Sequence, residues 1–316
     1  MRGAGLRVTN CKPPQHRPAQ RGILDQSHFT SRHYWETGSL DLAANRGWLG
    51  RYLDQVGTAD NPLQGLSMDG TLSPMIATAE KPVAAIDSVD GYDLWSRVSE
   101  PVTAEMYRSF GRFGSLPADS PAMRQVRRAT AQTDKLRSDL GGVGEFTSPV
   151  AYPNTSFAHK LAGLAAYIQF GLPIRVATIR AAGGYDTHSG QAEDLERNLR
   201  QTCEGLLAFQ RDLEARGLDD RVLVEVWSEF GRRPEENGSQ GTDHGAAGCA
   251  FVIGSRAKGE MVGEFPGLTN LDGNDNLRVT SDFRGMYCSL LEQWLEFDAA
   301  QIIPGAAGFT RPTLVA

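Results

Sequence analysis

The sequence predicts an α/β fold with a mostly parallel central sheet. In the second half of the chain, an apolar run at 174–179 precedes a long amphipathic stretch at 191–216, and another apolar run follows at 222–227. A strand, a helix and a strand in this order indicate parallel strands joined by a right-handed crossover. The 316 residues are 40% hydrophobic, which is enough for the core of one large domain or of two ordinary ones.

The first third of the chain shows few regular elements. Residues 1–22 hold arginine, lysine, proline and glutamine without an apolar segment, which predicts a flexible tail and no secretory signal. A helix is expected to begin near Ser27 and to end at Gly38, and a second helix is expected over 48–53. Residues 60–120 are rich in glycine, proline, serine and aspartate, and they predict loops with short strands.

Two helices are expected in the middle of the chain. Ser120-Pro121 joins an N-cap residue to a proline at the first helical position, and the helix should then run to Leu140. The next helix spans 156–170, because apolar residues recur there at helical spacing, namely at Phe157, Leu161, Leu164 and Ile168.

The amphipathic stretch at 191–216 predicts a long helix that Gly217 ends. Its expected apolar face consists of Leu195, Leu199, Cys203, Leu206 and Leu213. A short strand is predicted at 250–253. The sequence Thr280-Ser281-Asp282 then predicts the N-terminus of a last helix.

Composition excludes several classes of protein. The net charge is −6 and no long basic run occurs, so duplex nucleic acid is not an expected partner. The four cysteines are far apart and form no CxxC pair, which argues against a zinc ribbon and against a dense disulfide framework. No apolar run approaches the length of a membrane span. The chain also lacks the HExxH, GxSxG, Walker A and GxGxxG motifs.

Three short motifs within 183–245 concentrate the chemically active side chains. The first is Gly183-Gly184-Tyr185-Asp186-Thr187-His188, which follows the predicted strand at 174–179. Side chains two apart in an extended segment project to the same side, so Asp186 and His188 could bind the same ion. The alternative is a surface turn in which Asp186 caps the helix that follows.

The second motif, Ser228-Glu229-Phe230-Gly231-Arg232, ends the predicted strand at 222–227. Glu229 could be a metal ligand or a general base, and Arg232 could bind an oxyanion through its planar fork. The alternative is an ion pair of Glu229 with Arg232 or Arg233 that only fixes the loop, since a lone buried charge is costly.

The third motif is Gly241-Thr242-Asp243-His244-Gly245. Adjacent side chains rarely both reach one ion, so one of Asp243 and His244 is expected to bind the metal and the other to support it. The alternative is a hydrogen-bonded loop histidine.

Taken together, the motifs predict one metal or anion site built from separate loops, because α/β sheets form ligand sites beyond the carboxyl ends of their strands. The candidate metal ligands are Asp186, His188, Asp243 and His244. Two histidines with two or three carboxylates suit zinc, manganese or iron better than calcium, which prefers oxygen ligands alone.

In this order, the three motifs resemble the signature of the domain-of-unknown-function family 1501 (DUF1501). Supporting stretches are Ser27-His28-Phe29, 47–53 and 280–284, and the resemblance covers about residues 23–316. That family is placed in the alkaline phosphatase and sulfatase superfamily. The resemblance therefore implies a single domain over 23–316 with a three-layer, alkaline phosphatase-like fold.

The resemblance also implies metal-assisted transfer of a phosphoryl or sulfuryl group. Asp186 and His188 match the aspartate and histidine of one metal site, and His244 matches the later histidine that completes it. The Ser-Glu-Phe-Gly stretch at 228–231 matches the superfamily's Ser-Asp-His-Gly stretch at a second metal. Phe230 takes the place of that histidine, which argues against a second ion.

Ser27 matches the position of the superfamily's nucleophile, at the start of a helix with Ser31-Arg32 one turn in and Thr37-Gly38 at its end. The alternative is that Ser27 is only an N-cap. His28 and His33 are expected on the surface of this helix.

The family's first strand and its acidic metal ligand should precede Ser27, and residues 1–22 resemble neither. The chain therefore resembles an N-terminally truncated member whose first strand is missing. Members of the family are typically bacterial and often carry a twin-arginine export signal. The resemblance thus implies export to the periplasm or the exterior, although residues 1–22 show no signal peptide.

Two functional hypotheses remain open. In the first, the chain is a metal-dependent hydrolase of small phosphate or sulfate esters. Asp186, His188 and His244 hold the ion, Glu229 supports it, and Arg232 binds the anionic substrate. In the second, the chain is a degenerate member that binds a metal or an anion, or assembles with partners, without turnover.

Overall fold

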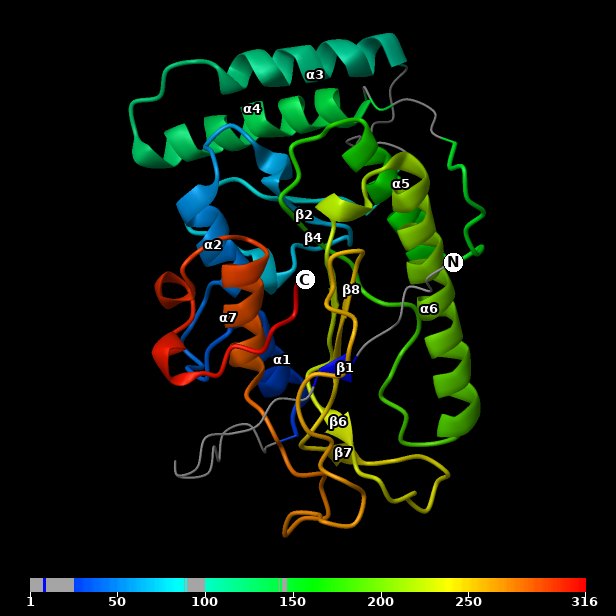
Figure 1. The fold of residues 1–316 in the computed structure, drawn as a ribbon. Coiled ribbons are helices and arrows are strands. Elements are labelled where there is room, and N and C mark those ends of the chain that lie inside the picture. The colour runs from blue at the N-terminus through cyan, green and yellow to red at the C-terminus, as the bar shows by residue number, and fades with distance from the viewer. Residues whose placement is uncertain (1–7, 10–25, 88, 90–99, 142, 144–146) are drawn as a thin grey trace.

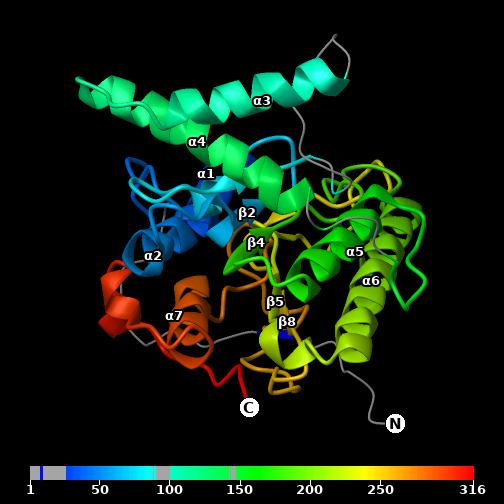
Figure 2. The same ribbon diagram turned by 90° about the horizontal axis from the view of Figure 1, so that it is seen from above.

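The computed structural model describes residues 8–9, 26–87, 89, 100–141, 143 and 147–316. In the described part of the chain, short strands lie between two groups of helices (Figures 1 and 2). On one side are α1 (His28–Thr37), α2 (Trp48–Val56) and α7 (Phe283–Gln293). On the other side are α5 (Ser156–Gln169) and α6 (Gln191–Arg216). The architecture is thus mixed α/β.

One sheet is parallel, as the sequence predicts. Its strands are β2 (Gly65–Ser67), β3 (Ala84–Ala85) and β4 (Val176–Thr178), in the order β3-β2-β4. The central strand β2 pairs in parallel with both neighbours, and Leu66 lies opposite Ala84 on one side and Ala177 on the other. The loop that follows β4 carries the first of the three motifs.

A second sheet departs from the prediction. Its strands are β1 (Val8–Thr9), β8 (Ala250–Ile253) and β5 (Val224–Val226), and β8 pairs antiparallel with both others. The expectation that the strands on either side of α6 share one parallel sheet is wrong for the described residues. After β5 the chain reverses through a ribbon of β6 (Gly231–Arg232) and β7 (His244–Gly245), which returns β8 antiparallel to β5.

The helix termini confirm most of the signals in the sequence. Ser27 is the N-cap of α1 and Gly38, at φ 62°, is its C-cap. The helices α2 and α5 and the last helix lie where they were expected, and α6 has the predicted bounds. The predicted helix after Ser120 is α4 (Pro121–Gly141).

One helix was missed, namely α3 (Glu100–Gly114), in the region expected to hold loops and short strands. Its glycines are packing positions, because α3 lies closely against α4. A Cβ at Gly111 would lie 2.2 Å from Oδ2 of Asp134, and one at Gly114 would lie 2.6 Å from the backbone nitrogen of Ala131. Glycine therefore permits the close approach of the two helices.

The buried face of α6 also differs from the predicted apolar face. Leu199 is 45% exposed and Cys203 is exposed, whereas Asn198 and Thr202 are buried. The reason is a polar contact with the first motif. Asn198 donates to the carbonyl of Gly184, and Thr202 shares a hydrogen bond with the Tyr185 hydroxyl. This half of α6 therefore holds the motif loop instead of filling the core.

The hydrophobic core divides between the two helical groups. Trp48, Leu53, Tyr287 and Leu291 pack between α2, α7 and the antiparallel sheet. The other cluster joins α5, α6 and the parallel sheet. Among the described residues, no helix combines the length and the apolar character that crossing a membrane requires.

Candidate metal centre

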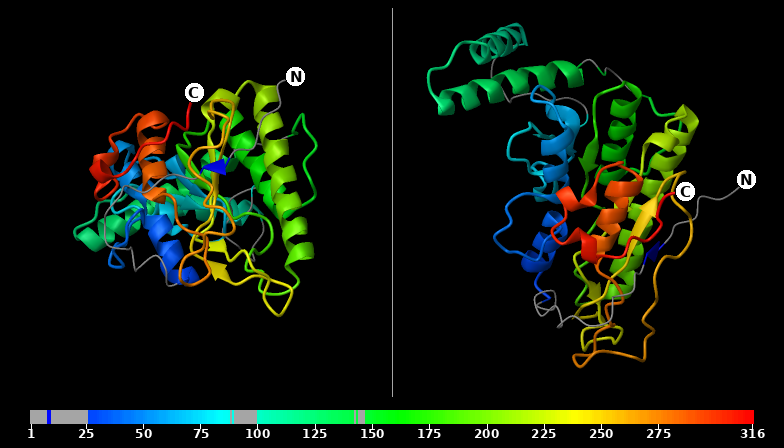
Figure 3. Two further views of the ribbon diagram at one scale, coloured as in Figure 1. Left: turned by 60° about the horizontal axis from the view of Figure 1, so that its bottom comes forward. Right: turned by 60° about the vertical axis from the view of Figure 1, so that its left-hand side comes forward.

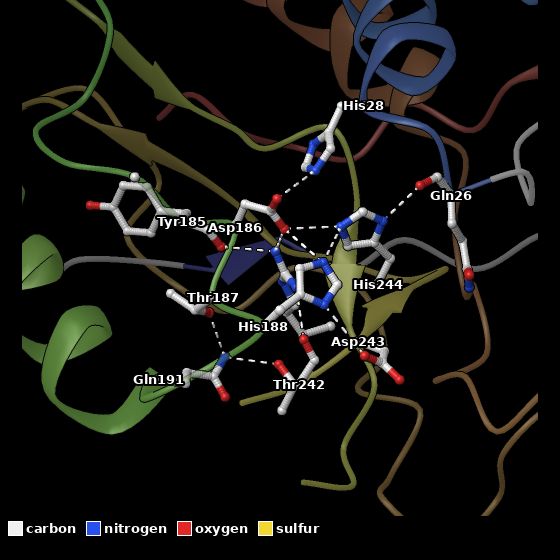
Figure 4. A network of polar contacts seen from close by, with 12 residues as sticks. Gln26, His28, Tyr185, Asp186, Thr187, His188, Gln191, Thr242, Asp243 and His244 are labelled. Carbon is white, nitrogen blue, oxygen red and sulfur yellow. Dashed lines mark hydrogen bonds and ion pairs between the residues drawn. The ribbon is translucent and has the colours of Figure 1, made fainter. Parts of the chain in front are cut away.

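Three parts of the chain that are distant in the sequence meet near the ribbon of β6 and β7 (Figures 1 and 4). The loop after β4 supplies Asp186 and His188. The ribbon supplies Arg232 on β6 and His244 on β7, which lie opposite each other in register. The first turn of α1 supplies His28, and the loop after β5 supplies Glu229.

Three histidines direct the same ring nitrogen at one carboxylate. Nε2 of His188 and Nε2 of His244 each lie 3.0 Å from Oδ1 of Asp186. Nε2 of His28 lies 3.3 Å from Oδ2 of Asp186. His28, Asp186 and His244 offer ligand atoms that all lie within 4.8 Å of one another. The prediction that Asp186 and His188 face the same side is confirmed by these distances.

The other nitrogen of each ring faces an oxygen atom. Nδ1 of His28 lies 2.6 Å from Oε1 of Glu229, and Nδ1 of His188 lies 3.4 Å from Oδ1 of Asp243. Nδ1 of His244 lies 2.7 Å from the carbonyl oxygen of Gln26. Carbonyl and ionised carboxylate oxygens only accept hydrogen bonds, so in all three rings Nδ1 carries the proton and donates.

This proton arrangement leaves a lone pair on each Nε2 of a neutral ring. Those lone pairs then point at an anion, and Nε2 of His188 lies only 2.9 Å from Nε2 of His244. Two facing lone pairs repel, and a cation bound by both nitrogens would remove that repulsion. In metal sites, the imidazoles that bind the ion usually donate their other N–H to an oxygen in this way.

The spacing of the ligand atoms also fits an ion. The distances between Oδ1 of Asp186 and the two Nε2 atoms of His188 and His244 are 3.0, 3.0 and 2.9 Å. Atoms about 2.1 Å from one ion are about 3.0 Å apart at an angle of about 90°, and about 3.4 Å apart at the tetrahedral angle. The triangle therefore matches one face of an octahedron.

Arg232 ties the motif loops together. Its guanidinium forms an ion pair with Oδ1 of Asp186, and Nη2 also donates to the carbonyl of Tyr185 at 3.1 Å. Nη1 donates to the carbonyl of Thr242 at 2.8 Å. One side chain thus fixes the carboxylate and joins the loop after β4 to the ribbon.

The carboxylates of the centre are held in their ionised form. Partial burial pushes the pKa of Asp186 upward, but the hydrogen bond and the charge of Arg232, together with the adjacent rings of His244 and His28, outweigh it and bring the pKa well below its usual range. Burial likewise raises the pKa of Glu229, and the hydrogen bond from His28 more than offsets that effect. The amide of Asn237 and the ring of His188 lower the pKa of Asp243.

Glycine allows the two histidine-bearing loops to approach each other. A Cβ at Gly241 would lie 2.2 Å from the carbonyl carbon of His188. Beside this contact, the amide of Gln191 donates to the hydroxyls of both Thr187 and Thr242. The two loops are therefore held against each other by backbone packing and by a shared hydrogen-bond donor.

Comparison with models of protein families matches residues 24–285 to the family described as "Protein of unknown function (DUF1501)". The chain belongs to the DUF1501 family. No curated protein and no solved structure matches the chain. The match covers all three motifs, as the sequence resemblance implied.

In this DUF1501 chain, some of the predicted site residues lie at the candidate centre and others lie beside it. Asp186, His188 and His244 lie together at the centre. Asp243 turns its carboxylate to Nδ1 of His188. Ser27 caps α1 by accepting from the backbone nitrogen of Thr30 at 3.5 Å, and its neighbours on both sides in the chain contact the centre.

Two alternatives from the sequence do not hold. Gly190, and not Asp186, is the N-cap of α6. The contact at Oε1 of Glu229 is with His28, whereas Arg232 pairs with Asp186. Glu229 and Arg232 therefore each contact a segment that is distant in the sequence, and they do not pair within their own loop.

The residue that sequence reasoning missed in this DUF1501 chain is His28, which was expected on the surface of its helix. Its side chain is 37% exposed and contacts both Asp186 and Glu229. Phe230 packs against the rings of His28 and His244, with centroids 4.8 and 4.4 Å away. The only local signal for His28 was its place directly after Ser27, because its position beside Asp186 depends on tertiary contacts.

Proposed function

We propose that this chain binds one divalent ion, namely zinc, manganese or iron, and uses it to hydrolyse small phosphate or sulfate esters. The ion would be held by His28, Asp186, His188 and His244. The main support is that the Nε2 atoms of the three histidines lie close to the Asp186 carboxylate, while the Nδ1 atom of each ring faces an oxygen atom. The hydrolase part of the proposal rests further on the resemblance to the alkaline phosphatase and sulfatase superfamily.

Each residue of the centre has a distinct task in this proposal. Glu229 and Asp243 orient His28 and His188 through Nδ1, and Arg232 holds the Asp186 carboxylate in place. When bound, the ion would supply a Lewis acid that stabilises negative charge developing on the ester oxygens. Nitrogen and oxygen ligands together suit zinc, manganese and iron.

Ser27 is the proposed nucleophile. It precedes His28, and the carbonyl of Gln26 on its other side accepts from His244. Its hydroxyl oxygen would attack the phosphorus or sulfur atom, the alcohol would leave with a proton, and water would then release phosphate or sulfate from the serine. The position at the start of α1 resembles that of the superfamily's nucleophile.

A second candidate function is metal binding without turnover. Two observations favour it. The Ser27 hydroxyl accepts from the backbone nitrogen of Thr30, as expected for a helix cap. The Nη1 and Nη2 atoms of Arg232 contact Asp186 and two backbone carbonyls, so this guanidinium is engaged by protein oxygens. In this alternative the centre is structural or binds an anionic ligand.

Elemental analysis of purified protein tests the metal centre. The wild type should contain about one equivalent of ion, and His188→Ala and His244→Ala should each lose most of it. His33→Ala is the matched control, since His33 contacts the carbonyl of Asp41. Equal metal content in all four proteins would remove the proposed centre.

Turnover is tested on metal-loaded protein with a panel of aryl phosphates and aryl sulfates. The informative variant is Ser27→Asn, because asparagine also caps helices and so removes the nucleophile without removing the cap. Loss of turnover with unchanged thermal stability and metal content supports Ser27 as nucleophile. No turnover by the metal-loaded wild type on any ester of the panel selects the binding function.

A further inference from the structure

The hairpin of α3 and α4 presents an apolar surface that nothing in the described structure covers. Of the seventeen large hydrophobic side chains that are exposed in the described residues, seven lie within 102–126. They are Val102, Met106, Phe110, Phe113, Leu116, Met123 and Val126. The hairpin lies across one end of the molecule, where α4 packs on the body through Leu136 and Leu140 and α3 lies on its outer side (Figures 1 and 3). Its apolar side chains are therefore concentrated on an element at one end of the molecule.

The exposure follows from the helical repeat of α3. Val102, Met106, Phe110 and Phe113 lie three or four residues apart and share one face, and Met106 is 56% exposed there. A different face of α3 packs on α4, through the close contacts at Gly111 and Gly114 and through Tyr107, which is only 4% exposed. The helix thus has one face for its hairpin partner and another that is left open.

The same region is basic, although the chain as a whole carries a net charge of −6. Five arginines and two acidic residues lie within 102–128. One of these arginines, Arg127, lies over the ring of Phe113, 5.4 Å from its centroid. Its Nε and Nη1 atoms are buried and have no hydrogen-bond acceptor in the described structure. These buried atoms are out of reach of a ligand, whereas Arg124 and Arg128 on the same helix are exposed. Exposed cations near an apolar surface favour a ligand that combines phosphate groups with acyl chains.

We propose that the α3–α4 hairpin docks this protein onto the surface of a membrane that contains anionic phospholipids. Exposed Phe, Met and Val side chains would enter the boundary between headgroups and acyl chains, and the arginines would face lipid phosphates. This is the arrangement of an amphipathic element that lies on a bilayer without crossing it.

A second copy of the chain fits this surface less well. A two-fold contact would place the same surface on both protomers, so the basic region would face itself. The acidic residue Glu105 is already paired with Arg108 and Arg112 on its own helix, at 2.6 and 2.9 Å. It is therefore engaged within its own chain, whereas an anionic bilayer would supply negative charge for the arginines.

The hairpin and the metal centre lie at opposite ends of the molecule (Figures 1 and 3). Docking through the hairpin would leave the ribbon of β6 and β7 directed away from the bilayer. The proposal is therefore independent of the proposed hydrolase function, and either one can fail alone.

Co-sedimentation with vesicles tests the proposal on the full chain. Vesicles of phosphatidylcholine mixed with phosphatidylglycerol should bind the protein, and pure phosphatidylcholine should bind it at least tenfold more weakly. Met106→Gln with Phe110→Gln should reduce binding about tenfold. Arg124→Gln with Arg128→Gln should reduce it roughly 25-fold, because each basic residue near the surface contributes about fivefold.

Matched controls lie on α6. Leu199→Gln with Leu207→Gln removes two comparably exposed hydrophobic residues, and Arg197→Gln with Arg200→Gln removes two exposed arginines. Both control pairs should bind vesicles like the wild type. Equal binding to both kinds of vesicle, no binding to either, or equal loss in hairpin and control variants would overturn the proposal. A dimer in sedimentation velocity that Met106→Gln with Phe110→Gln dissolves, without vesicle binding, would identify a second copy as the occupant.

Discussion

Replacement of Glu229 by glutamine tests whether His28 is a metal ligand. The 2.6 Å hydrogen bond from Nδ1 of His28 to Oε1 of Glu229 is charge-assisted, and it fixes both the tautomer and the orientation of the ring. Glutamine keeps an oxygen that can accept but removes the charge, and mutation of such an outer partner costs about 10- to 100-fold in metal affinity, or about 1.4 to 2.7 kcal/mol. Glu229→Gln should therefore weaken metal binding by that factor.

The assay is competition with a chromophoric chelator at fixed pH, applied to a double-mutant cycle. His28→Ala should weaken binding at least as much as Glu229→Gln. The double variant should resemble His28→Ala alone, because Glu229 acts through the ring. Glu236→Gln, an exposed residue in the loop between β6 and β7, is the control and should bind like the wild type. Wild-type affinity in both Glu229→Gln and His28→Ala would refute the role given to His28.

Three further predictions concern other residues. Gly241→Ala should weaken metal binding about tenfold, because the added Cβ would displace the backbone at His188. Gly238→Ala is the control: its added Cβ would have no other atom within 4 Å, so this variant should bind metal like the wild type in the same titration. Asp54→Ala should lower the free energy of unfolding by about 2 kcal/mol at pH 7 in urea denaturation. Burial raises the pKa of Asp54, but three backbone N–H groups outweigh it and lower the pKa, so its contribution is present at neutral pH and disappears as the pH falls through the folded pKa. Burial raises the pKa of Glu225 from 4.5 to about 8, because the folded state favours the neutral carboxyl group. The free energy of unfolding is therefore highest below pH 4.5, where this group is neutral in both states, and it falls as the pH rises towards about 8. Glu225→Gln should therefore remove part of the decline in the urea midpoint between about pH 4.5 and pH 8, and an unchanged decline over that range would contradict this assignment.

Local signals in the sequence predicted the helix termini. Ser27 and Gly38 bound α1 because capping and a left-handed backbone are properties of single residues. The meeting of His188 with His244 was expected from the three motifs taken together, although the strands β4 and β5 that precede the first two motifs lie in separate sheets. Sequence order alone thus identified most of the candidate centre.

Features that depend on tertiary packing were not predictable in the same way. His28 looked like a surface residue, because its contact with Asp186 joins segments about 160 residues apart. The polar residues Asn198 and Thr202 are buried because they hold the motif loop. Gly111 lies in the region 60–120 whose composition predicted loops, whereas it lets α3 approach α4. In each case the partner, and not the local pattern, decided the structure.

The most direct test of the shared ion is anomalous X-ray diffraction from crystals of metal-loaded protein, measured at the absorption edge of the metal found by elemental analysis. The predicted result is one strong peak about 2.1 Å from Nε2 of His188 and Nε2 of His244, adjoining the carboxylate of Asp186 and the ring of His28. A fully loaded crystal whose peak lies away from these two rings would contradict the account.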